Sequence, residues 1–399
     1  MEIIIMRNRI CWRTLFLLIV SLLTLSNTGY SQGERFEKLK QLRDRFDADG
    51  DGRLSSEERA NLQKFLQGLR QKPQSEDIPA SLIPGKTGLY GDVPGRFTLK
   101  VIESHELPDE RRGKVIPLRI TFPAETGSYP LIVHCHGAGG SKENGQPLVQ
   151  HWVSHGYVVI QPTFGDSISN LTPQERLQFE SIGDFVSSAK VTLEWKNRPD
   201  DVKAVLDSLT LLEKTFPELE GRIDTTKIGV SGHSYGAHTT MLLSGMTMML
   251  PSGQSLNLKD DRIRAAVMIS PQGPGNSIQS KSYSTISPPT LMITGDNDGT
   301  PQVGKATLKG DWRKQAYEGL EPGDKYLLWI NDAHHNFGGI SGVNHSGAGP
   351  VAPDQVLILN STVMAFFDAY LKEIPEAQDY LKSDAIQKNA RGLARMNGK

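Results

Sequence analysis

The chain has 399 residues, of which 37% are hydrophobic and 22% are charged, a composition typical of globular proteins. Its 44 basic and 45 acidic residues leave a formal net charge of −1, which argues against nucleic acid or another strongly charged polymer as a partner. The length allows two or three domains, although an α/β fold often places about 250 residues in one unit.

The first 31 residues have the pattern of a secretory signal peptide. Arginines precede an apolar run from Leu15 to Leu25, and Gly29 and Ser31 suit a cleavage site before Gln32. The apolar run is shorter than the roughly 20 residues of a typical membrane-spanning helix. We therefore expect a secreted or periplasmic protein without a stable membrane span, and a single membrane anchor is the alternative.

A calcium-binding loop is predicted between two short amphipathic helices. Residues 47–58 read DADGDGRLSSEE and fill the ligand positions of an EF-hand loop. The predicted ligands are Asp47, Asp49, Asp51, the carbonyl group of Arg53, Ser55 and Glu58. Calcium prefers such hard oxygen ligands, so we expect a structural or regulatory Ca²⁺ ion. A merely acidic, solvated loop is the alternative.

The chain is expected to divide at changes of composition. The predicted segments are a signal peptide at 1–31, an EF-hand segment at 32–72, a polar linker at 73–84, a large domain at 85–385 and a tail at 386–399. The linker is assigned because it is rich in proline and polar residues.

Within the large domain, short apolar runs alternate with helical stretches. The candidate strands are Phe97–Ile102, Ile116–Phe122, Leu131–His136, Val158–Pro162, Lys227–Ser231, Ala265–Ser270, Thr290–Thr294 and Tyr326–Ile330. The candidate helices lie near 148–155, 199–215, 235–245, 307–319 and 355–372. This alternation predicts an α/β fold with an eight-stranded, mostly parallel sheet and helices on both faces.

The most informative chemical motif is a serine between two glycines. The sequence GHSYG at 232–236 directly follows a predicted strand and precedes a predicted helix. On such a strand-to-helix turn, a strained backbone projects the serine hydroxyl to where a base can reach it. Because the motif also occurs by chance, its interpretation as a nucleophile depends largely on the predicted strand before it and the predicted helix after it. Ser234 is the predicted nucleophile.

A glycine-rich turn supplies candidate donors for an oxyanion. The sequence HGAGG at 136–140 follows the strand at 131–136. Backbone N–H groups of such a loop can face a substrate carbonyl, together with the N–H of the residue after the nucleophile. The predicted pair is Ala138 and Tyr235, with an ordinary turn as the alternative. His136 is a candidate for ordering this loop.

An acid and a base are predicted after two later strands. The sequence GDND at 295–298 offers Asp298, with Asp296 as the alternative, and NDAHHNFGG at 331–339 offers His335, with His334 as the alternative. The carboxyl ends of parallel strands gather at one edge of a sheet. The order serine, aspartate, histidine is also the order of an α/β-hydrolase triad.

With these motifs in view, the chain resembles the α/β-hydrolase superfamily, and within it the bacterial predicted dienelactone hydrolase branch related to platelet-activating-factor acetylhydrolases. The likeness spans about residues 90–375 and rests on PLIVHCHGAGGSKEN at 130–144, HGYVV at 155–159, RPDDV at 198–202 and GHSYG at 232–236. It implies a carboxylic ester hydrolase with Ser234, Asp298 and His335 as the triad.

The expected function is therefore that of an exported serine esterase acting on a small-molecule or lipid/polysaccharide ester, without a cofactor for catalysis. A serine peptidase on the same fold and a non-catalytic, calcium-dependent surface interaction protein are the alternatives. The segment from Gly165 to Asn197 contains Phe179, Phe185 and Trp195. It would serve as a lid or acyl pocket, or as ordinary core packing.

Overall fold

The computed structural model describes Ser55, Glu58 and Ala60, and then residues 82–179, 182–192, 194–275, 277–299, 308–342 and 349–399. The chain forms two compact units, residues 1–79 and 80–399. Nearly all of the described residues belong to the second unit, which carries the predicted chemical motifs.

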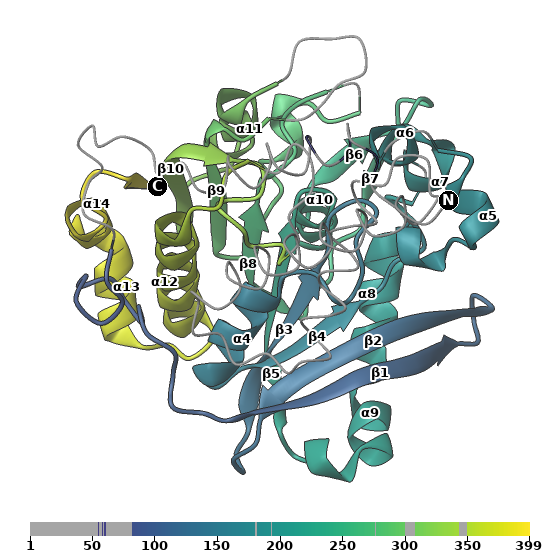
Figure 1. Ribbon diagram of the computed structural model, residues 1–399, viewed down its shortest axis with the longest axis horizontal. Coiled ribbons are helices and arrows are strands. Elements are labelled where there is room, and N and C mark those ends of the chain that lie inside the picture. Colours follow the sequence, from purple (N-terminus) through teal and green to yellow (C-terminus); the bar gives the residue numbers. More distant parts are fainter. Residues whose placement is uncertain are drawn as a thin grey trace, which may run out of the picture. The chain divides into compact units, whose positions relative to one another are not determined.

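A nine-stranded sheet forms the centre of the second unit (Figure 1). In spatial order its strands are β1 (Leu99–Asp109), β2 (Lys114–Pro123), β4 (Val158–Pro162), β3 (Tyr129–Cys135), β5 (Ile223–His233), β8 (Ile263–Ile269), β9 (Thr290–Asn297), β10 (Lys325–His334) and β11 (Ala394–Gly398). The six strands from β4 to β10 are parallel, and β1, β2 and β11 are antiparallel additions at the two edges. A separate hairpin joins β6 (Thr247–Met249) and β7 (Ser255–Asn257).

The predicted strand count of eight was wrong, because the sheet has nine strands. Each of the eight predicted runs overlaps a strand, and β11 is the additional one. It comes from the segment 386–399, which we expected to be a tail. Only Ala394 and Met396 of β11 are buried. A short edge strand that buries only every second side chain contains too few apolar residues to be distinguished from a tail by its sequence pattern.

The helices lie in chain order between and after these strands. They are α4 (Gln146–Ser154), α5 (Pro173–Arg176), α6 (Ile182–Ser187), α7 (Ala189–Thr192), α8 (Asn197–Asp207), α9 (Leu209–Thr215), α10 (Tyr235–Leu243), α11 (Gly310–Glu318), α12 (Pro353–Tyr370), α13 (Pro375–Lys382) and α14 (Ala385–Asn389). The helix predicted at 199–215 is divided into α8 and α9 at Ser208, whose N–H donates to the Val205 carbonyl three residues back.

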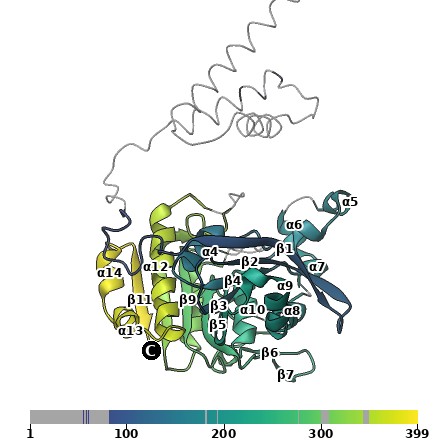
Figure 2. The same cartoon turned by 90° about the horizontal axis from the view of Figure 1, so that it is seen from below.

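Two hydrophobic cores cover the two faces of the sheet. Along β3, Leu131 and Val133 join the core that α8 to α11 close, while Ile132 joins the core of α4 and α12 to α14. Successive side chains of a strand point to opposite faces, so a strand buried on both faces becomes an unbroken apolar run. Helices α5 to α7 and α13 to α14 lie at opposite ends of the sheet in both views (Figures 1 and 2).

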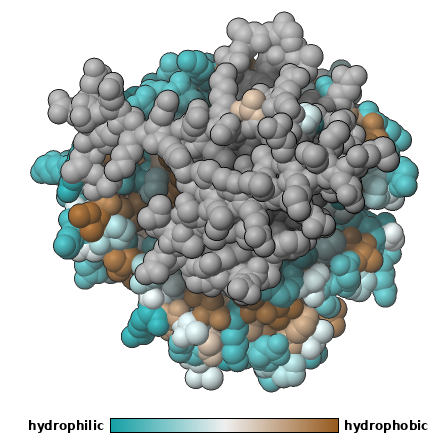
Figure 3. All heavy atoms as spheres, in the orientation of Figure 1, coloured by the Kyte–Doolittle hydropathy of each residue, from teal (hydrophilic) through white to brown (hydrophobic). Residues whose placement is uncertain are grey.

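Among the described residues, the exposed large hydrophobic side chains are Ile83, Val93, Val101, Val115, Leu177, Leu211 and Val351. Hydrophobic residues are interspersed with hydrophilic ones over the coloured part of the face in Figure 3. Within the described ranges, none of the helices combines the length and apolar character needed to span a membrane.

Candidate active site

Ser234 stands on a tight turn between β5 and α10. Its backbone has φ 58° and ψ −116°, a combination that is strained for any residue with a side chain. A Cβ atom on Gly232 would lie 2.2 Å from the Gly236 carbonyl oxygen, and one on Gly236 would lie 2.0 Å from the Cys135 carbonyl oxygen. Both glycines of the motif are therefore required by the close approach of backbone to backbone.

The structure brings Ser234, His335 and Asp298 together. Nε2 of His335 lies 2.9 Å from Oγ of Ser234, and Nδ1 of His335 lies 2.8 Å from Oδ1 of Asp298. A histidine that carries its proton on Nδ1 donates to the carboxylate and accepts from the serine hydroxyl. This is the arrangement in which a histidine can act as general base toward a serine.

The two alternative residues point elsewhere. The Asp296 carboxylate accepts hydrogen bonds from Trp329 Nε1 at 3.2 Å and from the Asp332 N–H at 2.7 Å, so it faces β10. His334 is the last residue of β10, and Gly349 packs so closely on its side chain that a Cβ there would lie 2.2 Å from the His334 Cβ atom. Asp296 and His334 belong to β9 and β10, whereas Asp298 and His335 follow the ends of these strands, where the chain turns toward Ser234.

Asp298 is fully buried, and its carboxylate has hydrogen-bond and ion-pair partners within the protein. Oδ1 accepts a hydrogen bond from the Ser270 hydroxyl at 2.5 Å, Oδ2 accepts one from the Thr294 hydroxyl at 2.9 Å, and Nε of Arg313 lies 3.1 Å from Oδ1. Burial alone would raise the pKa of Asp298, but the Arg313 charge and the hydrogen bonds from His335 and Ser270 lower it overall. The carboxylate therefore stays ionised beside the histidine.

The predicted donor loop lies against the serine. A Cβ atom on Gly137 would lie 3.6 Å from the Cβ atom of Ser234. Across the part of the chain that the structure describes, the backbone N–H groups of Ala138 and Tyr235 have no hydrogen-bond acceptor. Two such free donors next to a serine can receive a developing negative charge.

A buried ion pair fixes this loop. Arg198 donates to the carbonyl oxygens of His136 at 2.8 Å and Gly137 at 3.2 Å, and it binds both carboxylate oxygens of Asp166. Asp166 in turn accepts a hydrogen bond from the Gly139 N–H at 3.2 Å. Burial raises the pKa of Asp166, but the Arg198 charge and hydrogen bonds lower it overall. The loop is therefore held by charges that water does not reach.

His136 completes the support of the loop. Its Nδ1–H donates to the Gly137 carbonyl at 2.6 Å, and Nε2 accepts from the Phe164 N–H at 3.0 Å. Burial, assisted by the nearby Arg198 charge, lowers the pKa of His136 to about 3. The ring is therefore neutral, as one donated and one accepted bond require.

The segment expected to be a lid or acyl pocket packs beside the donor groups. Its small apolar cluster is formed by Leu171, Phe185 and Val191, with Ile168, Phe179, Val186, Ala138 and Tyr235 packed against it. The Tyr235 hydroxyl donates to the Val191 carbonyl at 3.0 Å, and the Ile168 N–H donates to the Gly139 carbonyl at 3.1 Å. The segment thus places an apolar wall next to Ala138 and Tyr235, in which Leu171, Phe185 and Val191 are buried and Ile168 and Phe179 are partly exposed.

Sequence reasoning missed Arg198, Asp166, Ser270 and Arg313 as parts of this site. Arg198 stands in the RPDDV segment that contributes to the family resemblance, and Ser270 ends a predicted strand. Nothing in the local pattern marks Asp166 or Arg313, because their contacts in the site are with residues far away in the sequence.

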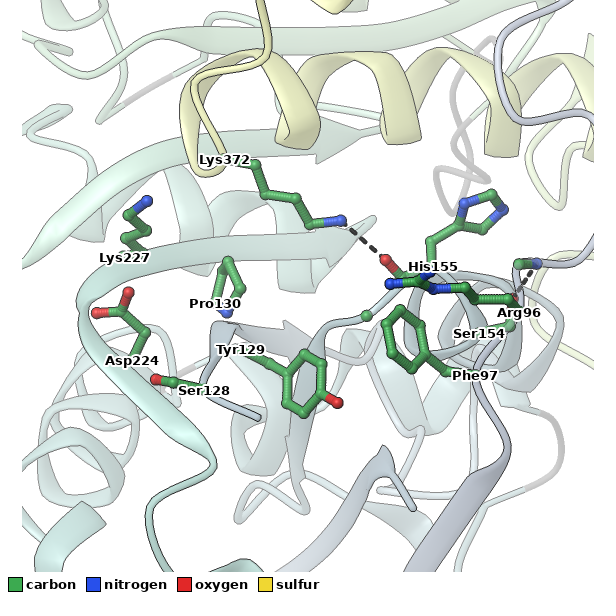
Figure 4. Close-up of a pocket in the computed structure, with 12 residues that line it drawn as sticks. Arg96, Phe97, Ser128, Tyr129, Pro130, Ser154, His155, Asp224, Lys227 and Lys372 are labelled. Atoms are coloured by element: carbon green, nitrogen blue, oxygen red, sulfur yellow. Dashed lines mark hydrogen bonds between the residues drawn. The ribbon is translucent and has the colours of Figure 1, made fainter. Parts of the chain in front are cut away.

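A pocket of about 640 Å³ lies at the end of the sheet where the parallel strands β3 and β5 begin. Tyr129 and Pro130 line it at the start of β3, and Asp224 and Lys227 line it near the start of β5 (Figure 4). Ser234 follows the opposite end of β5. The Ser154 hydroxyl in this pocket donates to a backbone carbonyl, so it is not paired with a base. The pocket is therefore not the candidate active site.

The predicted EF-hand falls largely outside the described residues. Asp47, Asp49, Asp51 and Arg53 are not among them, and Ser55 and Glu58 are. These last two form a reciprocal pair, in which the Ser55 N–H donates to Glu58 Oε2 at 2.7 Å and the Glu58 N–H donates to Ser55 Oγ at 3.3 Å. This pattern marks the first turn of a helix, as expected at the end of an EF-hand loop. Within the described ranges, no three His, Cys, Asp or Glu side chains gather as a metal site.

Comparisons with known proteins found similarity to chlorophyllases and to an acetylhydrolase. Residues 93–249 match the family model of chlorophyllase. The chain is 25% identical to platelet-activating factor acetylhydrolase of Cavia porcellus over 293 residues, which cover 64% of this chain and 61% of that protein. It is 27% identical to chlorophyllase-1, chloroplastic, of Citrus unshiu over 157 residues, and 26% identical to chlorophyllase type 0 of Chenopodium album over 128 residues.

These similarities are partial. The matched part spans 61% of the acetylhydrolase, 39% of the Citrus chlorophyllase and 32% of the Chenopodium protein. The names of both kinds of relative indicate ester hydrolases, and the family-model match at residues 93–249 includes the donor loop and the serine motif. Together with the large, mostly parallel sheet, the similarities support an α/β-hydrolase-like family for this chain.

Proposed function

We propose that this protein is a serine hydrolase that cleaves carboxylic esters. The observation that carries the proposal is the continuous hydrogen-bonded chain from Ser234 through His335 to Asp298, at 2.9 and 2.8 Å. Few structural roles require a strained serine to meet an imidazole that is itself oriented by a buried carboxylate. The similarity to an acetylhydrolase and to chlorophyllases agrees with it.

In the proposed reaction, the Ser234 hydroxyl attacks the ester carbonyl carbon while His335 Nε2 takes its proton. Asp298 holds the Nδ1–H and stabilises the imidazolium. The N–H groups of Ala138 and Tyr235 bind the oxygen that becomes negative, and each such donor typically contributes about 3 kcal/mol to the transition state. The intermediate expels the alcohol, which takes the proton from His335. Water, activated by the same histidine, then releases the acid.

The apolar wall next to the donor groups supports an ester with an apolar acyl or alcohol part. Phe179 and Phe185 pack edge to face with ring centroids 5.0 Å apart, and the cluster they belong to touches Ala138 and Tyr235. A small-molecule or lipid ester suits such a wall better than a polysaccharide, whose hydroxyl groups would be desolvated there.

Export and calcium binding remain part of the proposal. The signal-peptide pattern at 1–31 supports a secreted or periplasmic location, and the loop sequence at 47–58 supports a Ca²⁺ site. The helix-start pair of Ser55 and Glu58 agrees with such a loop ending at that point.

Substitution Ser234→Ala tests the function. We expect hydrolysis of p-nitrophenyl esters and labelling by a fluorophosphonate to be abolished, while the circular dichroism spectrum stays unchanged. Ser231→Ala is the matched control, because Ser231 is buried on β5, just before the Ser234 turn, and its hydroxyl contacts His134 rather than His335. Full turnover in Ser234→Ala would refute the proposal. A folded wild-type protein that is neither labelled nor active would favour a non-catalytic interaction protein.

A further inference from the structure

Behind the proposed triad lies a buried arginine, Arg313. Arg313 comes from α11, and its side chain is only 2% exposed. Nε of Arg313 donates to the backbone carbonyl of Asp298 at 3.0 Å and also lies 3.1 Å from the Asp298 carboxylate. One guanidinium thus contacts both the backbone and the side chain of the acid.

The same guanidinium reaches the end of β8. One terminal nitrogen of Arg313 donates to the carbonyl oxygens of Ser270 and Pro271, each at 3.0 Å. Ser270 has a left-handed backbone with φ 60°, which is unusual for a residue with a side chain. In this conformation its hydroxyl lies 2.5 Å from Asp298 Oδ1 and 2.9 Å from His335 Nδ1. Arg313 therefore ties together two strand ends that converge on the histidine.

The other terminal nitrogen of Arg313 lies 3.4 Å from His335 Nδ1. Both atoms carry protons when Nδ1 donates to Asp298, so this contact is between a cation and the edge of a ring that becomes positive during catalysis. A permanent positive charge at this distance opposes protonation of the ring, whereas the Asp298 carboxylate favours it.

We propose that Arg313 is a positioning residue that clamps Asp298 and limits how readily His335 accepts a proton, and so sets the lower pH limit of activity. This inference rests on the proposed esterase function. With Asp298 alone behind it, the histidine would remain protonated, and therefore unable to act as a base, up to a higher pH. The arginine offsets part of the carboxylate charge that favours protonation of the ring.

The other groups that face His335 do not supply this charge. His233, at the end of β5, lies with its ring centroid 4.8 Å from that of His335 and donates from Nε2 to the His335 carbonyl at 2.7 Å. Burial, followed by the neighbouring His335, lowers the pKa of His233 to about 3, so it is neutral. Ser234 and Ser270 are neutral as well. Among the described residues around the ring, Asp298 and Arg313 are the charged pair.

The test compares the pH dependence of kcat/KM for Arg313→Gln and Arg313→Lys. Gln removes the charge and keeps a donor for the carbonyl groups, whereas Lys keeps the charge and loses the planar geometry. We expect the acidic limb of the profile to move to higher pH by about one unit in Arg313→Gln and to stay near the wild-type position in Arg313→Lys. The position of a limb does not depend on the amount of active enzyme, so a partly unfolded preparation still gives the answer.

Arg262→Gln is the matched control, because Arg262 forms ion pairs with Asp260 and Asp207 at a partly exposed site near the start of β8. Its profile should match that of the wild type. An unmoved acidic limb in Arg313→Gln, with Ser234→Ala inactive, would overturn the role of Arg313 and leave the esterase proposal standing. Undiminished turnover in Ser234→Ala would instead overturn the esterase proposal itself.

Discussion

Arg198 and Asp166 form a completely buried ion pair beside the proposed oxyanion loop, with Nε to Oδ1 at 2.8 Å and the second nitrogen to Oδ2 at 2.7 Å. The Arg198 guanidinium also lies over two aromatic rings, with its central carbon 4.4 Å from the ring centroids of both Phe164 and Tyr235. The charge is thus stabilised by oxygen atoms and by the two rings.

The first prediction concerns this pair. Asp166→Asn leaves the Arg198 charge buried without its counterion, and breaking a buried pair in this way typically costs about 3–5 kcal/mol. We expect a lower free energy of unfolding in urea and a large loss of esterase activity. Exposed Asp261, which pairs with Lys259 on the surface, provides the control substitution Asp261→Asn. Equal stability of the two variants would contradict the role given to the buried pair.

The second prediction concerns the turn that holds Ser234. Gly236→Ala places a Cβ atom 2.0 Å from the Cys135 carbonyl oxygen, and relief of that overlap must move either β3 or the serine turn. We expect destabilisation of about 3 kcal/mol together with loss of activity, measured by thermal unfolding and ester hydrolysis. Gly275→Ala is the control, because its Cβ would meet nothing within 4 Å. A fully active Gly236→Ala protein would show that the turn is not tight.

The third prediction separates the two candidate acids. Asp298→Asn removes the charge that orients His335, and we expect kcat to fall by about 10⁴-fold, as in other serine triads. Asp296→Asn should stay within about tenfold of the wild type, because the Asp296 carboxylate binds Trp329 and the Asp332 N–H instead. A larger effect at Asp296 than at Asp298 would reverse the assignment.

The fourth prediction concerns stability and pH. Burial, as the largest cause, lowers the pKa of His134 and His238 from the ordinary 6.5 to about 4, and that of His136 and His233 to about 3. The unfolded chain therefore binds more protons than the folded protein between about pH 6.5 and pH 4, so stability is lost as the pH falls through this window. We expect a loss of about 1 kcal/mol or more per histidine between pH 7 and pH 5.

Urea unfolding at both pH values measures this loss. His238→Phe removes one titrating group from a buried site, where its ring stacks on Tyr235 with 5.8 Å between centroids. The difference in stability between pH 7 and pH 5 should shrink in this variant. An unchanged difference would mean that His238 does not contribute to the pH dependence.

The fifth prediction concerns calcium. Glu58 occupies the last ligand position of the predicted loop, where a bidentate carboxylate normally closes the coordination shell. We expect Glu58→Gln to weaken Ca²⁺ binding to the full chain by about tenfold or more, measured by calorimetric titration after removal of metal with EDTA. Glu57→Gln is the control, because the neighbouring position is not a ligand position. The prediction fails if the wild-type protein does not bind Ca²⁺ or if both variants bind it equally.

Much of the fold could be predicted from the sequence, because the central strands are buried on both faces and read as unbroken apolar runs. The edge strand β11 could not, since only Ala394 and Met396 point into the core. The break between α8 and α9 at Ser208 was also missed, because helical spacing continues across it.

The sequence by itself determined that a glycine-rich loop, a serine in a glycine-flanked turn, an acid and a base each follow a strand. The carboxyl ends of parallel strands lie at one edge of the sheet. Only the tertiary structure shows that Asp298 and His335 lie together beside Ser234, whereas the Asp296 carboxylate contacts Trp329 and the Asp332 N–H. It also decided that Arg198 and Arg313 stand behind the loop and the acid. Such contacts join residues far apart in the chain, so their physical cause lies in how the elements pack and in no local pattern of residues.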